Sequence, residues 1–138
     1  MQWDATPNAG FSTYEPWLPM AKGWTSVNVK WLEQDNTSIL NLYRRLLSAR
    51  RKSGALARGE YQPYAAERGL LSYFRVLEKE RVLIVLNFTH ADRTIRFPSS
   101  HVRGSVRVST SGDRDGEIIA DTVALRPDEG LVVDLGRA

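Results

Sequence analysis

The first nineteen residues hold two tryptophans, one phenylalanine, one tyrosine and three of the chain's six prolines. Trp24 and Trp31 follow, so all four tryptophans lie within residues 1–34. Neither the two-residue period of a strand nor the three-and-four spacing of a helix runs through this segment. The first residues of a domain are normally its most loosely held part, so such aromatic density is unusual there. We therefore predict that residues 1–34 form a loop-rich segment belonging to something larger.

The composition is that of an ordinary soluble domain. The chain has 138 residues, of which 42% are hydrophobic and 25% charged, enough for one domain and a short extra element. The absence of cysteine excludes disulfides, thiolate metal sites and cysteine nucleophiles. No signal peptide or membrane-length apolar run is apparent. We expect a cytoplasmic protein without cofactor or metal.

One amphipathic helix is predicted over residues 36–53. Its N-terminus would be capped by Asp35, Asn36 or Thr37, and Gly54 would provide a left-handed C-terminal cap. The apolar stripe consists of Ile39, Leu40, Leu42, Tyr43, Leu46, Leu47 and Ala49. We expect this stripe to pack on the rest of the chain or across a dimer contact. The arginines near its end indicate a solvated helix face rather than a nucleic-acid stripe.

From residue 56 onward the pattern changes to short strands separated by turn residues. Val82-Leu83-Ile84-Val85-Leu86 is apolar at every position, which is typical of a central strand covered on both faces. The predicted fold is mainly β, an antiparallel β-sandwich with Greek-key-like connections. The predicted strands are Leu70–Leu77, Arg81–Phe88, Arg93–Phe97, Val106–Thr110, Thr122–Leu125 and Leu131–Leu135.

Candidate chemical groups are few, and for most of them a structural role is the better interpretation. Asp4 and Glu15 are carboxylates surrounded by aromatic residues, but we expect the first to cap a turn and the second to be solvated. His90 and His101 are loop histidines without a nucleophile beside them. The segment 113–117 resembles an incomplete calcium loop, and we interpret it as a surface turn. No catalytic, cofactor-binding or metal-binding residue is assigned.

The tryptophans allow two interpretations. Trp3, Trp17, Trp24 and Trp31 could form a platform on which sugar rings stack. Such residues more often serve as packing anchors in a loop-rich layer, which is the interpretation that we favour.

Several landmarks in the same order resemble the C-terminal stretch of bacterial α-glucosidases of glycoside hydrolase family 13, the oligo-1,6-glucosidase-like branch. The resemblance is strong over residues 1–89 and loose after that. The landmarks are Met1-Gln2-Trp3-Asp4, Asn8-Ala9-Gly10-Phe11-Ser12, Pro16-Trp17-Leu18-Pro19, Val27-Asn28-Val29, Ile39-Leu40-Asn41-Leu42-Tyr43-Arg44-Arg45-Leu46-Leu47, Ala55-Leu56 with Gly59, and Leu86-Asn87-Phe88-Thr89.

The resemblance implies that the chain contains parts of two domains. Residues 1–55 would be the end of a (β/α)8 barrel, including its final helix, and residues 56–138 would be the β-sandwich called domain C. The family's catalytic carboxylates lie on earlier barrel strands, and no position here matches them. The chain alone would then be non-catalytic, with Met1 internal to a longer protein and the rest of the barrel as its partner. The parent would hydrolyse α-glucosidic bonds with retention; a carbohydrate-binding or protein-interaction module is the alternative.

Overall fold

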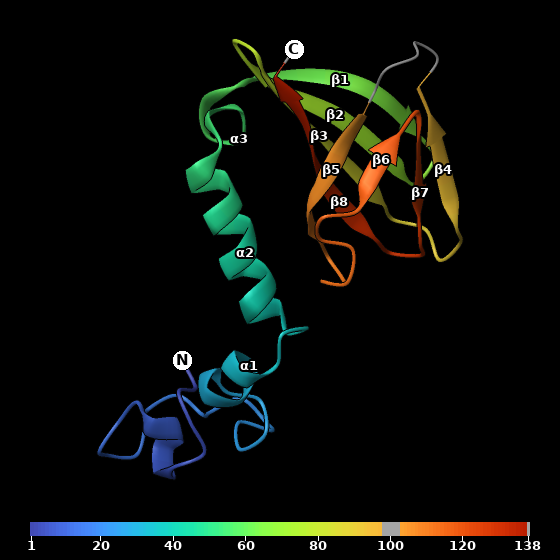
Figure 1. Cartoon of the computed structure of the whole chain (residues 1–138). Coiled ribbons are helices and arrows are strands. Elements are labelled where there is room, and N and C mark those ends of the chain that lie inside the picture. The colour runs from blue at the N-terminus through green and yellow to red at the C-terminus, as the bar shows by residue number, and fades with distance from the viewer. Residues whose placement is uncertain (98–102, 138) are drawn as a thin grey trace. The chain divides into compact units, whose positions relative to one another are not determined.

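The computed structural model describes residues 1–97 and 103–137 (Figure 1). These residues form two compact units, Met1–Arg44 and Arg45–Ala138. The first contains little regular structure, and the second contains the whole β-sheet. Predicted residue His101 lies outside the described residues.

The first unit is loop-rich, as predicted, but it holds two short helices: the 3-10 helix η1 at Pro7–Gly10 and the helix α1 at Val29–Gln34. The sequence did not predict the helix at 29–34. Asn28 stabilises this helix, since its buried side chain accepts a hydrogen bond of 3.1 Å from the amide of Trp31 and so caps α1. The amide of Val29 in turn donates to the carbonyl of Gln2 at 3.0 Å, which ties the chain's first residues to this helix.

The predicted long helix is present as α2, Ile39–Lys52, and begins three residues later than expected. The Asp35 carboxylate accepts from the amide of Thr37 at 2.8 Å and closes a turn there. Ser38 becomes the cap instead, with its hydroxyl 3.2 Å from the donating amide of Asn41. The stripe is only partly covered within this chain: Ala49 is buried, whereas Ile39, Tyr43 and Leu47 are exposed. Which surface covers it stays a prediction.

Gly54 does not form a left-handed cap, because it opens a further helix, α3 at Gly54–Arg58. The buried hydroxyl of Ser53 accepts from the amide of Leu56 at 3.0 Å and donates to Glu80 at 2.6 Å. The same carboxylate accepts from the amide of Ala55 at 2.9 Å. The Ser53 hydrogen bond holds the pKa of Glu80 below its usual range, so a charged residue of the sheet fixes the start of α3.

Eight strands form one antiparallel sheet in the order β1-β2-β3-β8-β5-β6-β7-β4. Figure 1 shows the sheet folded over on itself into two facing layers, which confirms the predicted β-sandwich; the Greek-key detail stays a prediction. The strands are β1 Glu60–Glu67, β2 Leu70–Leu77, β3 Glu80–Asn87, β4 Arg93–Arg96, β5 Arg103–Ser109, β6 Ile118–Ala120, β7 Thr122–Leu125 and β8 Gly130–Arg137.

Strand β3 is central, as its unbroken apolar run predicted, because it pairs with β2 on one side and β8 on the other. Leu83 and Val85 lie in the main core between the layers. Val82 and Ile84 point to the opposite face and pack in a smaller cluster with Ala55 of α3. Helix α3 therefore seals the outer face of the sheet beside β3.

The first and last strands of the sheet order come together at Tyr64. Its ring centroid lies 4.9 Å from that of Phe97, which follows β4, and 5.5 Å from that of Phe74 on β2. Its hydroxyl donates to the carbonyl of Arg96 at 3.3 Å. An aromatic cluster thus closes the seam where the folded sheet would otherwise expose two edges.

Candidate functional site

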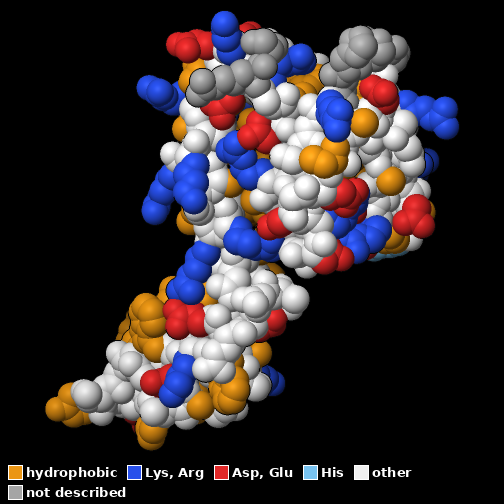
Figure 2. Space-filling model, in the orientation of Figure 1, with side chains coloured by type: hydrophobic (Ala, Val, Ile, Leu, Met, Phe, Trp, Pro, Cys, Tyr) orange, Lys and Arg blue, Asp and Glu red, His pale blue; other side chains and the backbone are white. Residues whose placement is uncertain are grey.

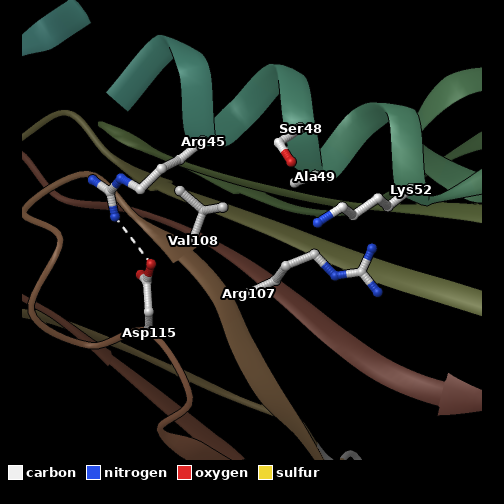
Figure 3. Close-up of a pocket in the computed structure, with 7 residues that line it drawn as sticks. All are labelled: Arg45, Ser48, Ala49, Lys52, Arg107, Val108 and Asp115. Carbon is white, nitrogen blue, oxygen red and sulfur yellow. Dashed lines mark hydrogen bonds and ion pairs between the residues drawn. The ribbon is translucent and has the colours of Figure 1, made fainter. Parts of the chain in front are cut away.

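One pocket, with a volume of about 360 Å3, lies between α2 and the strand β5 with the β5–β6 loop that follows it (Figure 3). Helix α2 contributes residues at positions i, i+3, i+4 and i+7, which share one helix face. Its lining consists of Arg45, Ser48, Ala49, Lys52, Arg107, Val108 and Asp115.

Arg45 bridges the two walls of this pocket. Its Nη1 lies 3.0 Å from the Asp115 carboxylate and its Nη2 donates to the carbonyl of Ser109 at 3.3 Å. The buried Nε of Arg45 has no hydrogen-bond partner among the described residues. The pocket holds three cations and one carboxylate, and that carboxylate is already paired. Such a set cannot supply the acid and nucleophile of a glycosidase.

A second pocket, of about 460 Å3, lies on the outer face of the sheet beside α3. The rings of Tyr61 and Tyr73 line it with centroids 5.0 Å apart and planes tilted by 42°. Arg50 and Arg75 flank the rings, and both are held by carbonyls of α3: Arg50 Nη1 lies 2.8 Å from the oxygen of Leu56. This pocket contains no acidic residue.

The four predicted tryptophans do not form a common platform. Trp3, Trp17 and Trp31 are exposed, Trp24 is half-buried, and no two of their rings are in contact within residues 1–44, all of which are described. Trp31 lines a pocket of about 250 Å3 together with Asp4, Lys30 and Gln34.

Asp4 caps a turn, as expected. Its Oδ1 accepts from the amide of Thr6 at 2.9 Å and from its hydroxyl at 2.5 Å, and these bonds hold the pKa of Asp4 below its usual range. It is the only acid lining the Trp31 pocket. Glu15 is exposed, and none of the described hydrogen bonds or ion pairs involves it. The structure does not bring these two carboxylates together.

His90 is exposed and pairs with Asp128 at 2.7 Å in a surface turn. The segment 113–117 is a turn in which arginines form ion pairs with two of the carboxylates. Asp113 pairs with Arg126 at 2.7 Å, and Glu117 pairs with Arg114 at 2.6 Å. Within residues 1–97 and 103–137, no three His, Asp or Glu side chains lie close enough together to hold a metal ion.

No helix within the described ranges is long and apolar enough to cross a bilayer.

Comparison with known proteins shows which family this chain is similar to. The family described as Alpha amylase, catalytic domain, matches residues 1–59. Trehalose-6-phosphate hydrolase of Bacillus subtilis is 28% identical over 140 residues, which cover 98% of this chain and 24% of that protein. Oligo-1,6-glucosidase of Bacillus cereus is 28% identical over 138 residues, with the same coverages of 98% and 24%. The crystal structure of isomaltulose synthase from Klebsiella sp. LX3 superposes with a TM-score of 0.84 at 27% identity, over 96% of this chain and 24% of that one.

The chain is therefore homologous to the glycoside hydrolases of family 13. More narrowly, it corresponds to part of an α-glucosidase-like enzyme of the oligo-1,6-glucosidase type, which confirms the resemblance. The chain spans about a quarter (24%) of the length of these relatives.

Two features of the site were not predicted. The pocket beside α2 is lined by residues more than fifty positions apart in the sequence. Which residues line it depends on how the helix lies along β5. The tyrosine pocket depends on β1, where Pro63 and a bulge between positions 63 and 65 hide the strand pattern. An aromatic residue at each of positions 61 and 73, on the two adjacent strands of a hairpin, was the available signal.

Proposed function

We propose that this chain is the C-terminal, non-catalytic part of an α-glucosidase-type enzyme. Residues 1–55 would complete a (β/α)8 barrel, and residues 56–138 would be the domain C sandwich. The single observation that carries the proposal is the exposed apolar surface of the first unit.

Residues 1–44 bury almost none of their apolar side chains. Ala9 is the only buried hydrophobic residue in this range, all of which is described. Figure 2 shows several orange hydrophobic groups on the surface of this unit. Ten large apolar side chains in the same range are exposed: Met1, Trp3, Phe11, Tyr14, Trp17, Leu18, Val27, Trp31, Ile39 and Tyr43. Exposed apolar surface of this extent marks an interaction site, and a barrel is a partner large enough to cover it.

The pockets support a non-catalytic role. Retaining glycosidases hold two carboxylates about 5 Å apart, whereas the pockets at Trp31 and Arg45 hold one acid each and the tyrosine pocket holds none. A further pocket beside β7 is lined by Asp92 and Glu117, but Arg114 already binds Glu117 at 2.6 Å. In family 13 enzymes the relevant site is assembled at the ends of barrel strands, and this chain contributes no such strand within its described residues. The parent reaction would be retaining hydrolysis of α-glucosidic bonds, in the cytoplasm.

A chimera tests the structural role. The last quarter of the Bacillus cereus oligo-1,6-glucosidase is replaced by this chain, and hydrolysis of an aryl α-glucoside is measured. We expect activity in the chimera and none in this chain alone. Leu47→Asp in the chimera should reduce soluble yield, whereas Tyr61→Asp on the sandwich, as a matched control, should leave it unchanged. An insoluble chimera, beside a soluble control rebuilt with the relative's own segment, would contradict the proposal.

Carbohydrate binding is the second candidate function, favoured by the pocket of Tyr61 and Tyr73. Tilted aromatic rings beside arginines can stack on sugar rings and donate to their hydroxyls. Titration calorimetry with isomaltose would show saturable binding that Tyr61→Ala removes and Tyr14→Ala retains. Because all tryptophans lie in residues 1–34, a shift in tryptophan fluorescence would instead indicate the tryptophan segment.

Self-association through the apolar face of the helix at 36–53 stays a prediction. Exposed Ile39, Tyr43 and Leu47 follow one another at intervals of four residues, which puts them along one side of α2. Sedimentation velocity of the wild-type chain and the Tyr43→Glu variant measures this. A dimer lost in the variant supports it; a monomer at all concentrations contradicts it.

A further inference from the structure

The turn between β5 and β6 contains the only Asp-Gly step of the sequence, Asp115-Gly116, and the sequence has no Asn-Gly step. The amide of Glu117 donates to the carbonyl of Arg114 at 3.0 Å, which places Asp115 and Gly116 at the two central positions of a β-turn. Gly116 has a φ of +90°, which residues with a side chain rarely adopt. The turn therefore requires glycine directly after this aspartate.

An Asp-Gly step is among the sequences in which the backbone reacts most readily with its own side chain. The amide nitrogen of Gly116 attacks Cγ of Asp115, and the amide proton leaves with the hydroxyl of the carboxyl group as water, which closes a five-membered succinimide. Water then opens the ring at either carbonyl and gives aspartate or isoaspartate, so no cofactor or other reactant is needed. A Cβ at Gly116 would meet no described atom within 4 Å, so nothing hinders the attack sterically.

Hydrogen bonds hold both reacting groups in the folded chain. The Asp115 carboxylate accepts from Nη1 of Arg45 at 3.0 Å and from the amide of Ser109 at 2.9 Å, and Figure 3 shows the Arg45 contact reaching from α2 to the turn. The attacking nitrogen of Gly116 donates to the carbonyl of Val106 at 2.7 Å. Cyclisation takes the proton from this nitrogen and one oxygen from the carboxyl group, so these bonds must break first.

We propose that Asp115 is a site of spontaneous isoaspartate formation, and that Arg45 protects it by holding its carboxylate. Without Arg45 the open turn should be populated about ten- to hundredfold more, the effect of losing one hydrogen bond between charged groups, and cyclisation should accelerate by the same factor. The pair is 27% and 37% exposed on its two side chains, so water reaches the succinimide. The reaction is confined to this turn and is the same whether or not the chain completes a barrel.

Isoaspartate formation would also be a lasting change. It adds a methylene group to the main chain of the turn and shortens the side chain that carries the carboxylate. The modified turn can then no longer present the same carboxylate to Arg45 and to the amide of Ser109, so the contact between α2 and the turn is lost with the modification.

Arg44 offers a matched control for Arg45. It is one position earlier on α2, is exposed, and forms its own ion pair with Glu33 at 2.6 Å. Arg45→Met and Arg44→Met therefore each remove one charge and one ion pair, but only the first frees Asp115. Asp115→Glu identifies the site, because the longer side chain would have to close a six-membered ring, which forms far more slowly.

The test incubates the full chain and the three variants at neutral pH and measures isoaspartate by peptide mapping with electron-transfer fragmentation. We expect slow accumulation in the wild type and in Arg44→Met, accumulation about tenfold or more faster in Arg45→Met, and none at position 115 in Asp115→Glu. The wild type in urea, which frees both reacting groups, should react at least as fast as Arg45→Met.

Circular dichroism establishes that each variant is folded. If Arg45→Met unfolds, Arg45→Lys and Arg44→Lys take the place of the pair, because lysine keeps the charge but cannot also reach the carbonyl of Ser109 as the arginine fork does. The proposal is overturned if the native wild type reacts as fast as the wild type in urea, if the variants at positions 44 and 45 react at the same rate, or if no sample forms isoaspartate at position 115.

Discussion

Glu129 accepts a hydrogen bond of 2.7 Å from Nη1 of Arg114, although only 3% of the Glu129 side chain is exposed. The same carboxylate accepts from Arg126, whose Nη2 lies 2.6 Å away. Two arginines therefore compensate one buried charge where the strand β8 begins. The network joins the β5–β6 loop to the β7–β8 turn, on the side of the sandwich where the segment 113–117 lies.

Removing that buried charge should destabilise the sandwich. Glu129→Gln leaves Arg114 and Arg126 with one partner fewer in a largely dry site, and we expect a loss of about 3 kcal/mol in the free energy of unfolding, measured in urea. Glu117→Gln is the control, because Glu117 binds the same Arg114 but is 43% exposed, and its loss should stay within about 1 kcal/mol. Equal losses in the two variants would contradict the role of burial.

The same network predicts acid sensitivity. Burial raises the pKa of Glu129, but hydrogen bonds from Arg126 and the charge of Arg114 outweigh it, so the pKa lies below the ordinary 4.5. Hydrogen bonds from Arg126 and Ser111 likewise hold the pKa of Asp113 well below its usual range.

Because these pKa values are lower in the folded chain than in the unfolded one, their stabilisation is complete above about pH 4.5 and is lost as the pH falls further. The Tm should therefore be level between pH 7 and 5 and fall below pH 4.5, with a shallower fall for Glu129→Gln. A decline that starts near pH 6 would point to other groups.

Asn87 uses its whole amide to hold the turn after β3. Its Nδ2 donates to the carbonyls of Ala91 and Arg126, each at 2.8 Å, while its Oδ1 accepts from the amide and hydroxyl of Thr89. The side chain is buried. Asn87→Asp keeps the shape but cannot donate, so we expect a loss of about 3 kcal/mol. Asn36→Asp, in an exposed turn, should change the free energy of unfolding by less than about 0.5 kcal/mol; a similarly small effect at Asn87 would refute the assignment.

Gly59 and Gly54 should respond differently to alanine. A Cβ at Gly59 would lie 2.5 Å from the backbone oxygen of Ala55, which cannot move without breaking α3. At Gly54 the nearest atom, 2.8 Å away, is the end of the flexible Leu77 side chain. We expect a loss of at least about 2 kcal/mol for Gly59→Ala and within about 1 kcal/mol for Gly54→Ala, by thermal unfolding. The reverse order would show that the close approach at Gly59 is not a constraint.

Hydrophobic periodicity correctly predicted the longer helix and the central strand. The stripe of α2 and the apolar run of β3 are long enough to be recognised without knowing their partners. Helices α1 and α3 were not predicted from the sequence, because they have only six and five residues and each depends on a single cap, Asn28 or Ser53. The cap that starts α2 was misplaced because Asp35 could equally close a turn, which it does.

The candidate sites were less predictable than the fold. The tryptophans drew attention because of their density, but the structure leaves three of them exposed and none of their rings in contact with another, so a sugar-stacking role for them stays a prediction. The pocket that Lys52 and Arg107 line has no sequence signal, since each is one basic residue among nineteen. Long-range juxtaposition of this kind requires the structure.

The most direct test of the central claim is the rate at which the purified chain alone hydrolyses an aryl α-glucoside. The account predicts no turnover above buffer. The pockets of Asp4 and Asp115 hold one carboxylate each and the tyrosine pocket holds none, and in the pocket lined by Asp92 and Glu117 the second carboxylate is bound by Arg114. Enzyme-like turnover that disappears in Asp4→Asn, the variant of the one acid beside Trp31, would contradict it.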